Sequence, residues 1–196
     1  MVKKEIVMIG RSNVGKSSIF KLLTKEKVPV GKKPGTTTKF KRFEFGNYIL
    51  VDFPGLGIRM SKKGRADVEK LQTKLIKYIE DNAHPNSRII EFALLIIDGS
   101  NFKRIVEKWE EFQVPLDIEA FNFLNEFDLN PLIVVNKIDK IPPKELDEKL
   151  NYISTRFGIS EEWKDSDTIV AISAKKMTGI KLLKEKIKER FSNYSI

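Results

Sequence analysis

Short apolar runs of strand length alternate along the chain with longer segments whose apolar residues recur at helical spacing. Three of the runs have no polar interruption, which is typical of central strands covered on both faces; they are Ile6–Ile9, Phe92–Ile97 and Leu132–Val135. Strands are predicted over Lys4–Ile9, Thr38–Phe45, Tyr48–Asp52, Ile89–Asp98, Leu132–Asn136 and Thr168–Ser173.

The predicted strand Thr38–Phe45 differs from the others because its phenylalanines alternate with charged residues. Such alternation indicates an edge strand with one exposed face. Gly46 and Asn47 follow it, and both residue types tolerate the positive φ of a tight turn. The pattern therefore predicts a hairpin that joins this strand to Tyr48–Asp52.

Helical stretches occupy the connections between the predicted strands, and four of them are Ser17–Lys25, Asp67–Asp81, Lys144–Phe157 and Ile180–Phe191. Alternation of strands and helices predicts an α/β fold with one mostly parallel sheet and helices on both faces. A length of 196 residues suits a single domain over 1–196.

The connection between Asp98 and Pro131 is longer than a single crossover helix requires. Two helical patterns fit it, Phe102–Phe112 and Asp117–Phe127, with Pro115 between them. Its residues 99–130 carry seven acidic and three basic side chains. We favour an extended helical crossover here, and the alternative is an insertion that docks a partner.

The absence of certain residue types and patterns excludes several kinds of functional site. The chain has no cysteine, which excludes disulfides, thiolate zinc sites and cysteine nucleophiles and fits a reducing cytoplasm. No apolar run reaches the roughly 18 residues that a transmembrane helix needs, so we expect a cytoplasmic protein with no membrane partner.

The formal net charge of +9 is unevenly distributed along the chain. Residues 1–65 contain 16 Lys and Arg against 4 Asp and Glu, a balance of +12, and the remaining residues balance at −3. A basic face favours a polyanionic partner such as nucleic acid. The alternative is a solvated surface that only keeps the protein in solution.

A phosphate-binding motif follows the first predicted strand. Gly10 to Ser17 reads G-R-S-N-V-G-K-S and matches G-x-x-x-x-G-K-[ST]. Its backbone N–H groups can wrap a β-phosphate, Lys16 can reach the β and γ oxygens, and Ser17 can give its hydroxyl to Mg²⁺. The predicted cradle comprises Gly10, Arg11, Ser12, Asn13, Val14, Gly15, Lys16, Ser17 and Ser18.

A second motif, Asp52-Phe53-Pro54-Gly55, follows the strand expected beside the phosphate loop. D-x-x-G is common by chance, so its position gives it value. Asp52 can hold Mg²⁺ through water there, and the Gly55 N–H can meet the γ-phosphate.

Two further motifs at strand ends predict guanine as the base. Asp139 of Asn136-Lys137-Ile138-Asp139 can accept from the two N–H groups of a guanine edge, which adenine lacks. Asn136 would brace the loop, and the stem of Lys137 would cover the base. In Ser173-Ala174-Lys175, the Ala174 N–H can meet the guanine O6. The alternative for Asn136–Asp139 alone is an exposed polar turn, and Ser173–Lys175 alone carries little information.

These motifs, together with Pro34-Gly35-Thr36-Thr37-Thr38, resemble the EngB (YihA/YsxC-type) family of the TrmE–Era–EngA–EngB–septin GTPases. The resemblance spans roughly residues 4–192, and Glu80–Ala83 and the long segment after Asp98 are similar to archaeal members. It implies a P-loop NTPase with a Ras-like GTPase domain and a six-stranded mixed sheet. It also implies Mg²⁺-dependent GTP hydrolysis and a role in large ribosomal subunit assembly.

The resemblance assigns Thr37 as the switch threonine that ligates Mg²⁺ with GTP bound, next to Gly35 and Thr36. Leu56 stands where Ras-type enzymes have a water-orienting glutamine, so we expect slow hydrolysis without an activator. In some related GTPases an asparagine at the position of Asn13 holds K⁺, which would make Asn13 catalytic beside Lys16 and Thr37. The alternative is that Asn13 only shapes the loop.

Basic residues cluster on the two segments whose shape should depend on the γ-phosphate; they are Lys27, Lys32, Lys33, Lys39, Lys41 and Arg42, then Arg59, Lys62, Lys63 and Arg65. We therefore predict a monomeric GTP- and GDP-binding switch whose GTP form exposes a face for ribosomal RNA or the large subunit. The alternatives are a signalling-type GTPase with protein effectors and a nucleotide-binding module with negligible turnover.

Overall fold

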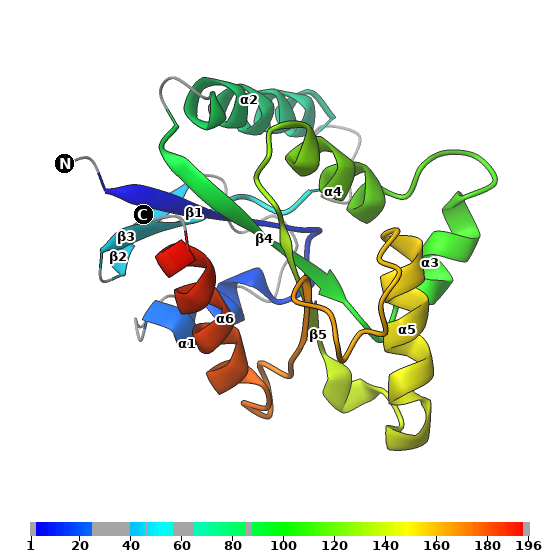
Figure 1. Cartoon of the computed structure of the whole chain (residues 1–196). Helices are drawn as coiled ribbons and strands as arrows, with labels where there is room; N and C mark the ends of the chain where they lie inside the picture. The colour runs from blue at the N-terminus through cyan, green and yellow to red at the C-terminus, as the bar shows by residue number, and fades with distance from the viewer. Residues whose placement is uncertain (1–2, 25–39, 46, 57–64, 85–87, 194–196) are drawn as a thin grey trace.

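Six strands form one mixed sheet in the computed structural model, which describes residues 3–24, 40–45, 47–56, 65–84 and 88–193 (Figure 1). The strands are β1 (Lys4–Ile9), β2 (Lys41–Phe45), β3 (Tyr48–Asp52), β4 (Ile90–Asp98), β5 (Leu132–Asn136) and β6 (Ile169–Ala171). Their spatial order is β2-β3-β1-β4-β5-β6, and every adjacent pair is parallel except β2 and β3. The predicted α/β class with a six-stranded, mostly parallel sheet is confirmed.

The strands with uninterrupted apolar runs occupy the middle of the sheet, as predicted. Side chains of β1, β4 and β5 are almost all buried, because helices cover both faces of these strands. β2 lies at an edge and pairs antiparallel with β3, with Phe45 opposite Tyr48. The predicted hairpin and edge strand are therefore confirmed, although Gly46 lies outside the described residues.

Helices form a layer on each face of the sheet (Figure 1). α1 (Lys16–Thr24) and α6 (Ile180–Asn193) pack on one face through residues such as Phe20 and Leu183. The other face carries α2 (Arg65–Ala83), α3 (Phe102–Trp109), α4 (Leu116–Glu126) and α5 (Leu146–Arg156). Alternate residues of each central strand face opposite layers, which gives the sheet two separate apolar cores.

Several element bounds differ from the sequence prediction. β2 begins at Lys41, and Thr38 and Lys39 lie outside the described residues. Pro143–Glu145 forms a 3-10 turn before α5 starts at Leu146. β6 ends at Ala171, because Ser173 leaves the sheet and forms an isolated bridge with Thr178.

The long connection between β4 and β5 contains two helices, as the pattern predicted. α3 ends at Trp109 and α4 begins after Pro115, which occupies its N-cap position. A helix end near proline is expected, since proline disfavours helical conformation in the residue before it. Among the described helices, none combines the length and apolar content needed to cross a bilayer.

Candidate nucleotide-binding site

The predicted site motifs gather at one edge of the sheet, where the parallel strands end. β1 leads into the phosphate loop, β3 ends in Asp52, and β5 ends in Asn136, whose register partner on β4 is Asp98. Ligands of open α/β sheets bind at this carboxyl edge. The motifs are separated along the chain, and the fold therefore brings them close together in space.

Lys16 folds back over the phosphate loop. Its Nζ donates to the carbonyl oxygens of Gly10 at 2.8 Å and Arg11 at 3.0 Å. Burial lowers the pKa of Lys16 to about 8, an effect that the negative charges of Asp52 and Asp117 partly oppose. A buried ammonium with nearby carboxylates is suited to meet phosphate oxygens, which would replace the loop carbonyls as acceptors.

Two glycines allow neighbouring segments to approach the phosphate loop closely. A Cβ on Gly15, whose φ is +107°, would lie 2.2 Å from Nδ2 of Asn136. A Cβ on Gly55 would lie 2.8 Å from Cα of Ser12. Side chains at either position would push apart the loop and the motif that faces it, so the close packing of the site requires glycine here.

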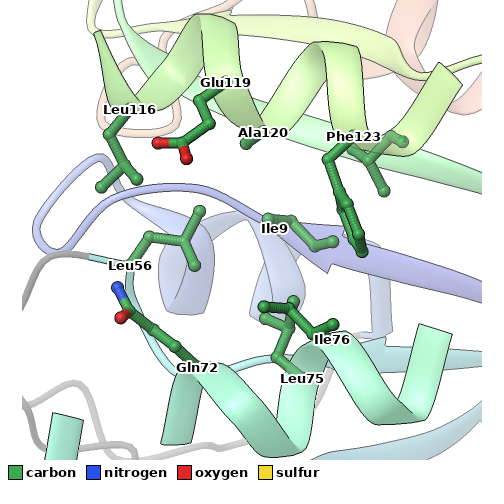
Figure 2. A pocket seen from close by; sticks show the side chains of 10 residues that line it. Ile9, Leu56, Gln72, Leu75, Ile76, Leu116, Glu119, Ala120 and Phe123 are labelled. Carbon is green, nitrogen blue, oxygen red and sulfur yellow. The ribbon is translucent and has the colours of Figure 1, made fainter. Parts of the chain in front are cut away.

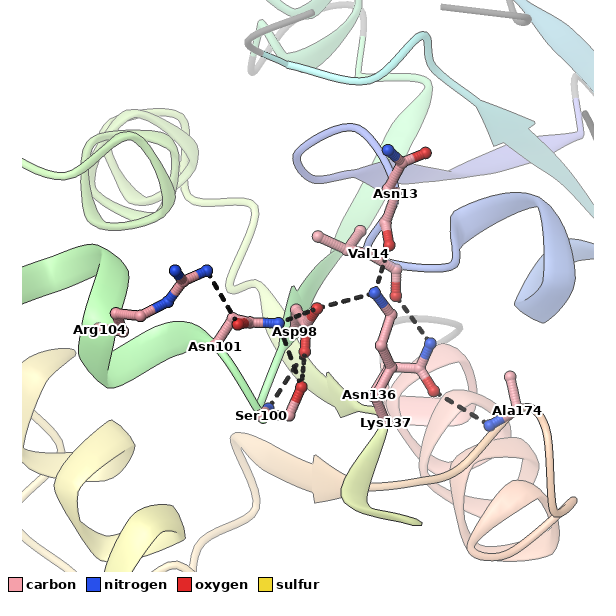
Figure 3. A network of polar contacts seen from close by, with 9 residues as sticks. All are labelled: Asn13, Val14, Asp98, Ser100, Asn101, Arg104, Asn136, Lys137 and Ala174. Atoms are coloured by element: carbon pink, nitrogen blue, oxygen red, sulfur yellow. Dashed lines mark hydrogen bonds and ion pairs between the residues drawn. The ribbon is translucent and has the colours of Figure 1, made fainter. Parts of the chain in front are cut away.

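Asn136 braces the phosphate loop against the segment that contains Ala174 (Figure 3), which agrees with the bracing role predicted for it. Its Nδ2 donates to the Val14 carbonyl at 2.7 Å, and its Oδ1 accepts from the Ala174 N–H at 3.0 Å. Asn136 is buried, so these bonds form in a poorly hydrated environment where unpaired groups are costly. One side chain thus joins three of the predicted motifs.

The Ala174 N–H was predicted to meet the guanine O6, and in the structure it already donates to Asn136. The predicted contact with a base would require this donor to be shared. Lys175, the last residue of the motif, is exposed.

The Lys137 ammonium contacts both β4 and the phosphate loop (Figure 3). Its Nζ donates to Asp98 Oδ2 at 2.7 Å and to the Asn13 carbonyl at 2.5 Å. Lys137 and Asn13 both have positive φ, 68° and 67°, which is uncommon for residues other than glycine. The two ammonium contacts hold the loop in place, and the role of the Lys137 stem in covering a base stays a prediction.

Asp139, the predicted guanine acceptor, is exposed and oriented by a neighbour. Ser173 Oγ donates to Asp139 Oδ1 at 2.6 Å, and the same hydroxyl accepts from the Lys176 N–H at 3.0 Å. Ser173 is itself buried, so the carboxylate is held against a fixed hydroxyl. This arrangement fits a carboxylate that accepts hydrogen bonds from a base edge.

Asp52 has the features of an unsatisfied metal ligand. Its side chain is fully buried, and neither carboxylate oxygen has a hydrogen-bond partner among the described residues. Burial raises the pKa of Asp52 to about 6, while Lys16 and Lys41 oppose the shift. A divalent cation would stabilise the charged carboxylate, and Ser17 stands in the first turn of α1 as a second oxygen donor.

The residues present therefore fit Mg²⁺. Within the described ranges, no group of three or more His, Cys, Asp or Glu side chains comes together to hold a metal ion. This is expected for Mg²⁺ beside a nucleotide, because phosphate oxygens and water complete its coordination.

Leu56 lies against an apolar cavity of about 280 Å³ between α2 and α4 (Figure 2). The cavity is lined by apolar side chains that include Ile9, Leu75 and Leu116, with Gln72 and Glu119 among the polar ones. Main-chain bonds fix the position: the Leu56 N–H donates to Gly10 at 3.0 Å, and its carbonyl accepts from the Ser12 N–H at 3.1 Å. The Leu56 side chain therefore lines this cavity, and it has no group that could orient a water molecule.

Comparison with known proteins agrees with this site. A family model described as "50S ribosome-binding GTPase" matches residues 5–137, which include the phosphate loop, Asp52–Gly55 and Asn136. A probable GTP-binding protein EngB of Methanococcus aeolicus is 38% identical to the chain over 98% of it and 84% of the relative. The chain belongs to the EngB family of GTP-binding proteins.

Solved structures extend the comparison. The crystal structure of a probable EngB protein is 32% identical, covers 96% of this chain and 99% of that chain, and superposes with a TM-score of 0.82. Era in complex with MgGDPNP and nucleotides 1506–1542 of 16S ribosomal RNA is 25% identical, with a TM-score of 0.67 over 95% of this chain and 56% of that chain. The EngB fold is thus a Ras-like GTPase fold.

Part of the predicted EngB-type site falls outside the described residues. Gly35, Thr36 and Thr37 lie there, as do most of the basic residues assigned to the two switches. Their predicted roles in nucleotide and Mg²⁺ binding stay predictions.

Sequence reasoning missed two acidic residues of the site. Asp98 ends β4 and holds Lys137; burial raises its pKa, but bonds from Lys137, Ser100 and Asn101 outweigh this and keep the pKa below its usual value. The rule that found Asp52, a polar residue ending a buried strand, could also have found Asp98. Asp117 forms an ion pair with Arg11, and no motif indicates it.

Proposed function

We propose that this chain hydrolyses GTP as a conformational switch in the assembly of the large ribosomal subunit. The observation that carries the proposal is the match to a 50S ribosome-binding GTPase family over residues 5–137. The likeness to Era bound to MgGDPNP and 16S ribosomal RNA supports a ribosomal RNA partner in general, since that RNA belongs to the small subunit. The basic balance of +12 over residues 1–65 also supports an RNA partner.

The chain's own residues bind and orient GTP. Backbone N–H groups of residues 10–18 and the Lys16 ammonium hold the phosphates, and Asp139 accepts from the guanine edge. Asn13 and Ser173 support this arrangement through their bonds to Lys137 and Asp139. When bound through Asp52, Ser17 and Thr37, Mg²⁺ would neutralise charge on the phosphates.

Hydrolysis is slow without an activator in this proposal. Leu56 faces an apolar cavity and cannot orient the attacking water. A ribosomal particle would supply or order the missing group. We include K⁺ held by Asn13 as one source of positive charge at the phosphates.

The test is GTP turnover with and without archaeal 50S particles, in KCl and in NaCl at matched ionic strength. Acceleration by 50S but not by 30S particles is expected, with binding that weakens as salt rises. A KCl preference that disappears in Asn13→Gly would implicate the Asn13 side chain. Glycine keeps the positive φ and the carbonyl that Lys137 uses, so the loop remains intact.

Unchanged turnover with 50S particles, together with co-sedimentation no stronger than with 30S, would overturn the ribosomal role. Equal rates in KCl and NaCl would overturn the K⁺ role alone. Tight GTP binding without any turnover would instead support the nucleotide-binding module.

A further inference from the structure

Helix α4 contacts the phosphate loop through a buried carboxylate. Asp117, in the first turn of α4, lies with its Oδ2 3.9 Å from Nη1 of Arg11, the second residue of the loop. The Asp117 side chain is 4% exposed and that of Arg11 is 26% exposed. The extended connection between β4 and β5 therefore forms an ion pair with a side chain of the phosphate loop.

Asp117 depends on Arg11 to compensate its buried negative charge. Its Oδ1 is buried and has no hydrogen-bond partner among the described residues, and Arg11 is its only ion-pair partner there. Burial raises the pKa of Asp117 to about 6; Arg11 opposes this most strongly, Asp98 adds to it, and Lys16 opposes it less. A buried carboxylate with one cation is costly unless that cation stays in place.

Arg11 in turn anchors the backbone that binds phosphate. The Arg11 carbonyl accepts a hydrogen bond from Lys16 Nζ at 3.0 Å. Arg11 also forms an isolated parallel β-bridge with Leu56, the residue directly after the D-x-x-G motif. Movement of the Arg11 main chain would therefore displace both Lys16 and Gly55. The contact of the Arg11 side chain with α4 therefore helps to keep Lys16 and Gly55 in position.

We propose that Asp117 is a positioning residue for the phosphate loop, which it holds through Arg11, and that it couples helix α4 energetically to nucleotide affinity. This inference rests on nucleotide binding at the phosphate loop and is independent of the ribosomal role. Because coupling is reciprocal, a partner that moves α4 would change nucleotide affinity, and bound nucleotide would change α4.

The experiment is a double-mutant cycle on the full chain, read by the affinity for the fluorescent analogue mant-GDP in Mg²⁺. Asp117→Asn and Arg11→Met each weaken binding about five-fold or more. The double variant is no weaker than the weaker single variant within about two-fold, because both changes break one contact. In steady state, Asp117→Asn raises KM for GTP and leaves kcat unchanged, since the loop holds ground state and transition state alike.

Glu119→Gln is the matched control, because Glu119 is exposed and lies in the same first turn of α4. It removes a similar interaction with the helix dipole and leaves mant-GDP affinity unchanged. Thermal unfolding of each variant checks that it folds, and Asp117→Glu, which keeps the charge, restores part of the affinity if Asp117→Asn folds poorly.

Additive losses in the cycle, or an Asp117→Asn variant with lower thermal stability and unchanged affinity, would overturn the inference and leave Asp117 as a structural residue only. Failure of the unmodified protein to bind mant-GDP would overturn the guanine-nucleotide site itself, and with it this role. If the double-mutant cycle shows the expected coupling but 50S particles do not stimulate GTP turnover, only the ribosomal proposal fails.

Discussion

The side-chain nitrogen of Asn136 donates a 2.7 Å hydrogen bond to the carbonyl of Val14, a residue 122 positions earlier in the chain. The oxygen of the same amide accepts from the Ala174 N–H, so one buried residue joins the phosphate loop to both parts of the predicted guanine site. The predicted phosphate and base contacts are therefore mechanically linked through one side chain, although Asn136 and Val14 lie far apart in the chain.

Asn136→Ala should weaken GDP binding about ten-fold or more, because the two halves of the site lose their shared brace. The free energy of unfolding should fall by about 1–3 kcal/mol, since a buried carbonyl and a partly buried N–H lose their partner. Isothermal titration with GDP and denaturant unfolding measure the two effects. Asn122→Ala, an exposed change on α4, is the control and should alter neither. Unchanged GDP affinity in Asn136→Ala would refute the mechanical link.

The sequence predicted this brace because the motif places an asparagine at the end of a buried strand, and strand ends of a parallel sheet converge. Apolar runs likewise predicted the central strands, since only a strand covered on both faces has no polar positions. Local pattern was therefore sufficient for the fold class and for the positions of the candidate motifs, whose chemical roles stay predictions.

The same reasoning could not find the contact of Asp117 with Arg11. An acidic residue in the first turn of a helix is ordinary. Its burial depends on how α4 packs against β4. The sequence could not predict the direction of the Leu56 side chain either, because that direction depends on the space between α2 and α4. Both features arise from tertiary packing, which composition and periodicity do not encode.

Leu56→Gln should not convert the chain into a faster enzyme. The Leu56 side chain is 8% exposed and faces the apolar cavity, so an amide there loses apolar contacts and hydration. We expect the free energy of unfolding to fall by about 1–3 kcal/mol and single-turnover GTP hydrolysis to rise by no more than about two-fold. Leu182→Gln, at a 46% exposed site on α6, should change neither. A ten-fold faster Leu56→Gln enzyme would mean that the side chain turns toward the phosphates.

Asp52 should make the protein without metal and nucleotide less stable as pH rises. Burial raises its pKa in the folded state from 3.8 to about 6, against the opposing charge of Lys16. Its full contribution to stability is therefore present below about pH 4, where both folded and unfolded chains are protonated, and is lost as pH rises through about 6.

Asp52→Asn removes this loss, so in EDTA at pH 7.5 it should be more stable than the unmodified protein by on the order of 2 kcal/mol, with the difference shrinking below pH 5. The gain should be reversed by ligand: with MgGDP the unmodified protein becomes the more stable of the two, because asparagine provides no charge for the cation. Denaturant unfolding across pH, with and without MgGDP, measures both arms, and Asp81→Asn on the exposed face of α2 is the control. An Asp52→Asn variant that MgGDP stabilises as much as the unmodified protein would show that Asp52 serves no metal.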